Sequence, residues 1–286
     1  MLEKLSAILK KSASAEAIAW LDETLAAQRD SFERKPFYYA FSGVSRRFEK
    51  RGGINFSEED LKQLDQEVPG FTVKGWDQFR VARVMLLLVL AEQDKDTFLE
   101  TIEALLNTAD LREQVAILSA FSVLPHGESL TEYAREGLRS NIVDVFDAVA
   151  LDNPFPSQEF SDDAWNQMVL KALFISRPLY RIYGIDYRAN LTLAEALSNL
   201  AHERWAAGRW VSPELWRSCS NFLTDQIVED VTRVAGTDEA GQKEAAALIV
   251  HQDEEGRLDH LKDTVRTFLD DVADHRLTWH SLGEQL

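Results

Sequence analysis

Apolar residues recur along this chain at the three- and four-residue spacing of a helix face. The clearest face belongs to a helix expected over about residues 76–92 and is formed by Phe79, Ala82, Leu86, Val89 and Leu90. The same spacing returns in the segments 98–106, 111–121, 142–149, 165–172 and 258–272. No segment shows sustained apolar/polar alternation between turn residues, which is the pattern of a strand. The sequence therefore predicts an all-α chain, with one long helix over 258–272.

Residues that favour helix starts and stops agree with this interpretation. Capping-box spacing, in which two side chains satisfy free backbone N–H groups, occurs at Asp110 with Glu113, Ser129 with Glu132 and Thr192 with Glu195. Ser212 precedes Pro213, which is a common pair at the first positions of a helix. The prolines of segment 153–156 interrupt the helical pattern, because proline disfavours helical geometry at the residue before it.

Short helices joined by short connectors predict antiparallel helix pairs stacked into an α-solenoid, and residues 76–151 look most like HEAT repeats. A compact helical bundle is the alternative, because no strict sequence period is present. No linker rich in Gly, Ser or Pro divides the chain. We therefore expect one domain over 1–286, with residues 1–75 as a helical cap and 76–286 as a helical-repeat core.

The net charge of the chain limits the classes of partner that it can bind. Its 286 residues include 31 Lys and Arg against 48 Asp and Glu, a net charge of -17. A field of this sign repels nucleic acid and anionic membrane surfaces, so we expect neither as a partner. The charge is uneven, however. Residues 171–217 contain 7 basic and 4 acidic residues, whereas residues 225–286 contain 6 basic and 15 acidic residues. A local anion site is therefore compatible with the acidic total.

Cysteine content and hydrophobic runs predict the compartment. Cys219 is the single cysteine, which excludes an intrachain disulfide and fits a reducing environment. The first residues lack the apolar core of a secretion signal. The longest apolar run, 84–91, is much shorter than a membrane span. We expect a cytoplasmic protein that does not insert into membranes.

The standard catalytic and metal-binding signatures are missing. The sequence contains no phosphate-binding loop, dinucleotide fingerprint or nucleophile elbow. His202 and Glu203 begin like a zinc-protease motif, but Ala206 stands where the second histidine belongs. The histidines between 251 and 280 match no ligand spacing, and Cys219 is expected to be a small core residue. We therefore expect no metal and no cofactor.

A segment rich in amides, basic residues and aromatics is the best candidate for binding. Amide and guanidinium groups fix the orientation of a polar organic ligand, while aromatic rings supply contact area. The candidate binding residues are Asn153, Trp165, Asn166, Lys171, Asp186, Arg188, Asn190, His202, Glu203 and Arg204. The alternative is structural: the same side chains satisfy helix ends and hydrogen bonds between helices.

This segment also resembles a known family. The similar stretches are 138–141, 153–156, 165–174, 184–190 and 202–209, which include the runs Asn153-Pro154-Phe155-Pro156 and His202-Glu203-Arg204-Trp205. They resemble the EboA family of bacterial metabolite traffic proteins, whose gene clusters are thought to move a secondary-metabolite precursor out of the cytoplasm. The resemblance implies a metabolite precursor or proteins of the same pathway as partners, and it supplies no catalytic residues.

Three functions remain open on this basis. The first is a non-enzymatic binding or scaffolding protein in precursor trafficking. The second is an enzyme that modifies the precursor, with His202 and Glu203 as acid/base groups and Arg188, Arg204 or Lys171 as anion clamps. The third is a pure protein–protein scaffold. A closed pocket lined by His202, Glu203 and Arg188 would favour a ligand or an enzyme, and an open apolar groove would favour a scaffold.

Overall fold

The computed structural model describes residues 1–49 and 52–286. In this part of the chain helices are joined by short connections, and the backbone pairing outside them is a single isolated antiparallel bridge between Gly53 and Asp77. The predicted all-α class is confirmed. The chain forms two compact units, Met1–Phe160 and Ser161–Leu286. No helix of the described residues is long and apolar enough to cross a membrane.

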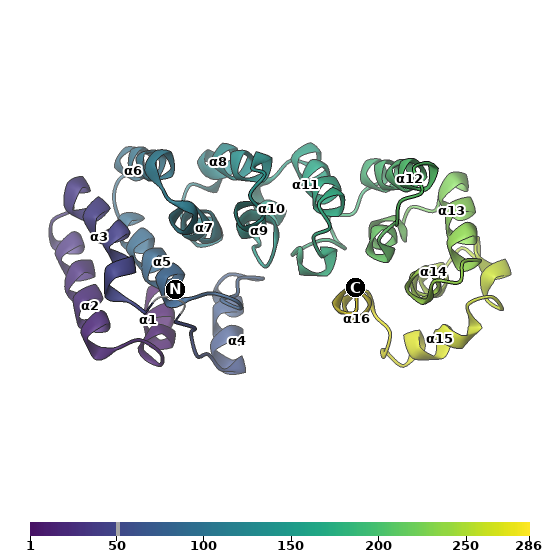
Figure 1. The fold of residues 1–286 in the computed structure, drawn as a ribbon, viewed down its shortest axis with the longest axis horizontal. Coiled ribbons are helices and arrows are strands. Elements are labelled where there is room, and N and C mark those ends of the chain that lie inside the picture. The colour runs from purple at the N-terminus through teal and green to yellow at the C-terminus, as the bar shows by residue number, and fades with distance from the viewer. Residues whose placement is uncertain (50–51) are drawn as a thin grey trace. The chain divides into compact units, whose positions relative to one another are not determined.

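The first unit is built on helix α5. Its α-helices are α1 (Leu2–Lys10), α2 (Ala15–Asp30), α3 (Arg34–Arg47), α4 (Glu58–Glu67), α5 (Gln78–Leu90), α6 (Lys95–Thr108), α7 (Leu111–Ala120), α8 (Gly127–Arg139), α9 (Val143–Ala150) and α10 (Phe155–Glu159). Helices α1, α2 and α3 pack against α5, and α4 packs against α1. Helices α5, α7 and α9 form an inner row (Figure 1). Helix α6 packs against α7, and α8 packs against α7 and α9.

Helix α5 is buried on nearly all sides, which explains its almost continuous apolar sequence. It also buries one charge. Arg83 is 1% exposed, its Nη2 lies 3.4 Å from Glu113 Oε1, and its guanidinium lies over the rings of Phe41 and Phe79. Asp110 and Glu113 form the predicted capping box at the start of α7. Glu113 therefore both caps α7 and balances the charge of Arg83.

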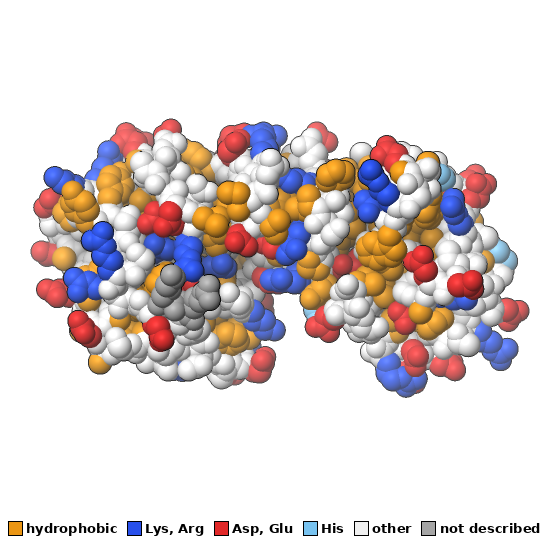
Figure 2. Space-filling view, in the orientation of Figure 1, with side chains coloured by type: hydrophobic (Ala, Val, Ile, Leu, Met, Phe, Trp, Pro, Cys, Tyr) orange, Lys and Arg blue, Asp and Glu red, His pale blue; other side chains and the backbone are white. Residues whose placement is uncertain are grey.

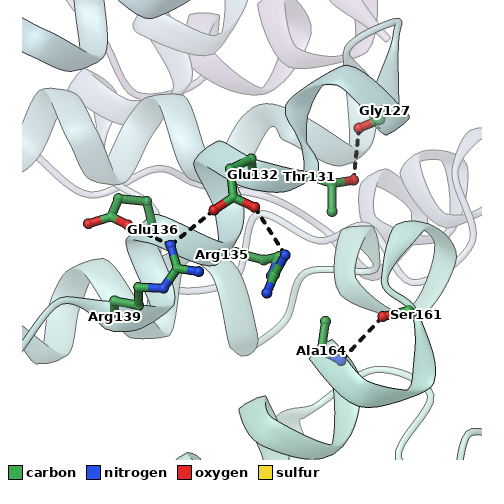
Figure 3. Close-up of polar contacts among 8 residues, drawn as sticks. All are labelled: Gly127, Thr131, Glu132, Arg135, Glu136, Arg139, Ser161 and Ala164. Atoms are coloured by element: carbon green, nitrogen blue, oxygen red, sulfur yellow. Dashed lines mark hydrogen bonds and ion pairs between the residues drawn. The ribbon is translucent and has the colours of Figure 1, made fainter.

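The predicted capping box at Ser129 and Glu132 is wrong. Helix α8 begins at Gly127, so both residues lie inside it. Glu132 instead accepts hydrogen bonds from Arg135 and Arg139 on the next turns of the helix, at 3.0 Å each (Figure 3). Two residues with the spacing of a capping box can equally lie inside a helix and form ion pairs there. Here the helix begins before Ser129, so the spacing does not mark its start.

The second unit begins with α11. Its helices are α11 (Asp162–Phe174), η2 (Leu179–Arg181), α12 (Leu191–Ala206), η3 (Pro213–Cys219), α13 (Asp225–Ala235), α14 (Ala240–Gln252), η4 (Asp259–Leu261), α15 (Arg266–Ala273) and α16 (Trp279–Glu284). Ser161 caps α11 by accepting the Ala164 N–H (Figure 3). The 3₁₀-helix η3 lies at the centre of this unit, in contact with α12, α14, α16 and η2.

Two expectations for the second unit are wrong. Helix α12 is capped by Asn190, whose Oδ1 accepts the Leu193 N–H at 2.9 Å, and not by the predicted pair Thr192 and Glu195. The single long helix expected over 258–272 is divided into η4 and α15. Gly256 has a φ of 72°, and the Leu258 N–H donates to the Asp253 side chain, so the chain turns where the apolar spacing alone suggested the start of a helix.

Candidate functional site

A cavity of about 370 Å³ lies within the second unit. Its polar lining consists of Ser176, Arg177, Tyr180, Arg204, Ser212, Glu214 and Glu284. Its remaining lining consists of Leu173, Pro178, Leu200, Trp210, Leu215, Gly283 and Leu286. These residues come from α11, η2, α12, η3 and α16, from the connections 175–178 and 207–212, and from the residues after α16. The volume falls in the range of small-molecule sites, which are typically 300–1,000 Å³.

Helix α12 and the loop after it form one wall. Leu200 and Arg204 are one turn apart on α12, so both side chains face the cavity. After the helix the chain reverses at Gly208, whose φ of 64° is costly for other residues. The reversed loop places the Trp210 carbonyl 2.6 Å from Arg204 Nε, and this carbonyl accepts the hydrogen bond that the Nε–H group donates. This bond fixes the guanidinium plane and leaves the Trp210 ring about half exposed beside the cavity.

A buried carboxyl forms another wall. Glu214 is 3% exposed, and its Oε2 and Oε1 accept the backbone N–H groups of Leu179 and Tyr180 at 2.9 and 2.5 Å. Burial raises the pKa of Glu214, and these two hydrogen bonds oppose the increase. Helix α16 closes against this group at Gly283. A Cβ atom there would lie 2.6 Å from both Glu214 Oε1 and Tyr180 Cδ1, so only glycine fits.

The cavity therefore combines both signs of charge with apolar surface. Arg177 and Arg204 are basic, Glu214 and Glu284 are acidic, and leucine, tyrosine and tryptophan side chains also belong to the lining. Figure 2 shows the same mixture on the face it presents, where hydrophobic side chains gather below α12 with acidic and basic side chains around them. Such a lining suits a small organic molecule with polar ends.

A separate polar network links α12 to α13. His202 Nε2 lies 2.6 Å from Asp230 Oδ1, and the Ser198 hydroxyl donates to Asp230 Oδ2 at 2.6 Å. Gln226 Nε2 donates in turn to the Ser198 hydroxyl at 2.7 Å. Asp230 is buried, whereas the His202 side chain is about half exposed. In many enzymes a buried carboxylate binds the histidine that acts as general base and fixes its orientation in this way. However, Ser198 donates to Asp230 and not to His202, so the three do not form a nucleophile triad.

Several predicted binding residues serve the core of the second unit. Trp165 is fully buried, and the Arg188 guanidinium lies 5.0 Å from the centre of its ring. Arg188 also pairs with Asp162 at 2.9 Å. Asn166 and Asn190 exchange hydrogen bonds between their side-chain amides at 3.2 and 2.9 Å. These contacts match the structural alternative for the same residues.

The other predicted binding residues are more dispersed. Asn153 belongs to the first unit, where its buried amide donates to the Leu118 and Ala148 carbonyls. Asp186 accepts two hydrogen bonds from Arg217, at 2.5 and 2.6 Å. Lys171 is partly buried on α11, and Glu203 is exposed on α12. Of the ten residues, all of which the structure describes, Arg204 lines the cavity and the other nine lie outside its lining.

Sequence reasoning missed Glu214, Tyr180 and Gly283. A signal for Glu214 was present, because it is an acidic residue in the short apolar run 213–216 of an otherwise basic segment. Tyr180 and Gly283 carried no comparable signal, since their positions depend on the docking of α16 against η2. Among the described residues no group of three or more His, Cys, Asp or Glu could hold a metal ion.

Cys219 is a core residue, as predicted. It is fully buried, and its thiol contacts the Ala194 and Leu215 carbonyls at 3.6 and 3.8 Å. Burial raises the pKa of the thiol far above its ordinary value. A thiol in this state is a poor nucleophile.

The fold and the site define an all-α protein with a cavity of small-molecule size in its second unit. The family described as metabolite traffic protein EboA matches residues 1–220, and the chain belongs to this family. The match includes the cavity walls from α11, α12 and η3, whereas α16 lies beyond it. No curated protein and no solved structure matches the chain.

Proposed function

We propose that this chain is a non-enzymatic binding protein that holds a small secondary-metabolite precursor in the cavity of the second unit. The cavity itself is the observation that carries the proposal, since its volume and mixed lining suit a small organic ligand. The family description, which names metabolite traffic, gives the cavity a role. Holding a precursor in this way fits a cytoplasmic step before export, and the single buried cysteine fits that compartment.

The proposal is tested by filling the cavity. Leu200→Trp adds a large side chain to the lining, and anilinonaphthalene sulfonate serves as an anionic aromatic probe. We expect the variant to bind the probe about tenfold more weakly, or roughly 1.4 kcal/mol, because the ring occupies the ligand volume. His202→Ala is the matched control, because His202 lies on the same helix outside the lining. Equal probe binding by the Leu200→Trp variant would contradict the proposal.

The second candidate is an enzyme, and the His202–Asp230 pair is the observation that favours it. In that case His202 acts as a general base on a metabolite at the surface of α12 and α13. The same two variants separate the candidates when the exported metabolite is measured in cells. Loss of export in Leu200→Trp alone supports the binding protein, and loss in His202→Ala alone supports the enzyme. Export retained in both supports a protein scaffold.

A further inference from the structure

The ionisable groups that line the cavity of the second unit indicate the class of ligand. A site for an anion alone needs only its basic residues, yet this lining includes two acidic residues, Glu214 and Glu284. Glu214 is the more informative because it is buried, and burying a carboxyl away from water is costly unless it is paired. The retention of such a group at a cavity wall requires a physical reason.

The hydrogen bonds of Glu214 account for part of its capacity. Each of its two oxygens accepts one backbone N–H bond, from Leu179 and Tyr180. An ionised carboxyl has about four acceptor positions, so these backbone donors use roughly half of them. The two backbone donors hold the group in place, and Gly283 packs so close to it that an added Cβ atom would lie 2.6 Å from Glu214 Oε1. An ammonium group is the donor best matched to a buried carboxylate, because solvent screens the pair weakly there.

A hydrogen bond also orients Arg204, a basic residue of the lining. The Arg204 Nε–H bond to the Trp210 carbonyl fixes the plane of the guanidinium. A planar guanidinium is suited to a carboxylate or another flat anion, which it binds through parallel N–H donors.

From this arrangement we propose that the cavity takes a small amphoteric molecule, whose ammonium group binds Glu214, whose anionic group binds Arg204 and whose aromatic or apolar part fills the rest of the cavity. This part contacts Tyr180, Trp210 and the leucine side chains of the lining. An α-amino acid with an aromatic side chain has this chemistry. The inference rests on the proposed function, because it requires that the cavity holds a ligand.

Three compounds with a common phenyl group test the inference on the unaltered protein. Phenylalanine carries both charged groups, phenethylamine carries only the ammonium, and phenylpropionate carries only the carboxylate. Binding is measured by ligand-observed NMR titration. We expect phenylalanine to bind at least about tenfold more tightly than either single-charge analogue, because each end adds a charge-assisted hydrogen bond. The Leu200→Trp variant should lose this binding.

A charge-neutral variant sharpens the test. Glu214→Gln should weaken phenylalanine to about the level of phenylpropionate and leave phenylpropionate unchanged, since only the ammonium partner is removed. Glu203→Gln is the matched control, because Glu203 is exposed and lies outside the lining. Equal binding of the three compounds, or a preference for phenylpropionate, overturns the amphoteric ligand but leaves the cavity as a binding site. Failure of the anilinonaphthalene sulfonate experiment overturns both proposals.

Discussion

Each unit of this protein buries a charged side chain, and the two charges have different surroundings. Arg83 in the first unit is enclosed by the helices around α5, with Glu113, two aromatic rings and the Phe41 carbonyl as its contacts. Glu214 in the second unit is equally buried but lines a cavity. The charge of Arg83 is balanced inside the core, whereas both hydrogen bonds to Glu214 come from uncharged backbone groups.

This difference separates a structural charge from a candidate binding group. Burying an ion pair costs desolvation free energy. The attraction between the two charges and their hydrogen bonds offset that cost. Burial raises the pKa of Glu214 by more than the electrostatic effects of Arg217 and His280 lower it. A group in this state gains free energy from a cationic ligand, while Arg83 has its partner within the protein. Replacement of Arg83 is therefore expected to lower stability, and replacement of Glu214 is expected to change ligand binding and the pH dependence of stability.

The largest expected effect is on the stability of the first unit. Arg83→Met keeps most of the side-chain volume but leaves Glu113 without its buried partner, which should cost about 3–5 kcal/mol of unfolding free energy. Urea denaturation measures this loss. Lys10→Met is the matched control, because the Lys10–Asp22 pair is about half exposed and should contribute less than about 1 kcal/mol. Similar losses in both variants would show that burial of Arg83 has no special importance.

A smaller effect is expected at the start of α4, also in the first unit. Hydrogen bonds from Lys11 and then from Ser57 lower the pKa of Asp60 to about 2. A lowered pKa means that stability from this group is present above its ordinary pKa of 3.8 and is lost as the pH falls through about 2. Asp60→Ala should cost about 1 kcal/mol at neutral pH, as loss of a cap does. The difference from the unaltered protein, followed by urea denaturation, should disappear in strong acid; a constant difference would contradict this.

The smallest expected effect is in the second unit, where the contribution of Glu214 to stability should change with pH in the direction opposite to that of Asp60. Because the folded-state pKa of Glu214 is raised, the folded protein binds this proton more tightly than the unfolded chain does. Stability from this group is therefore fully present below its ordinary pKa and is lost as the pH rises through the raised value. The unaltered protein should gain stability relative to Glu214→Gln between neutral and mildly acidic pH. Denaturation curves of the unaltered protein and of Glu214→Gln, measured at each pH, give this gain. If the stabilities of the two proteins change in parallel with pH, the prediction is wrong.

Local patterns in the sequence predicted the helices better than their ends. The capping box of Asp110 and Glu113 is present as predicted, since both residues lie within one turn and need no distant partner. The same spacing failed at Ser129 and at Thr192, because the two helices begin earlier, with His126 and Asn190 at the capping positions. The helix expected over 258–272 failed for a related reason: apolar spacing does not register the turn at Gly256.

The sequence by itself determined the all-α class, the family and the burial of Cys219, because these depend on composition, short motifs and spacing along one helix. Only the tertiary structure decided where a ligand could be held. The cavity requires α16 to pack beside Tyr180 and Glu214, which are separated from it by about 70 to 100 residues of chain. His202 and Asp230 likewise meet because α12 packs against α13. Such meetings are set by the summed packing of many apolar side chains, and no local pattern records them.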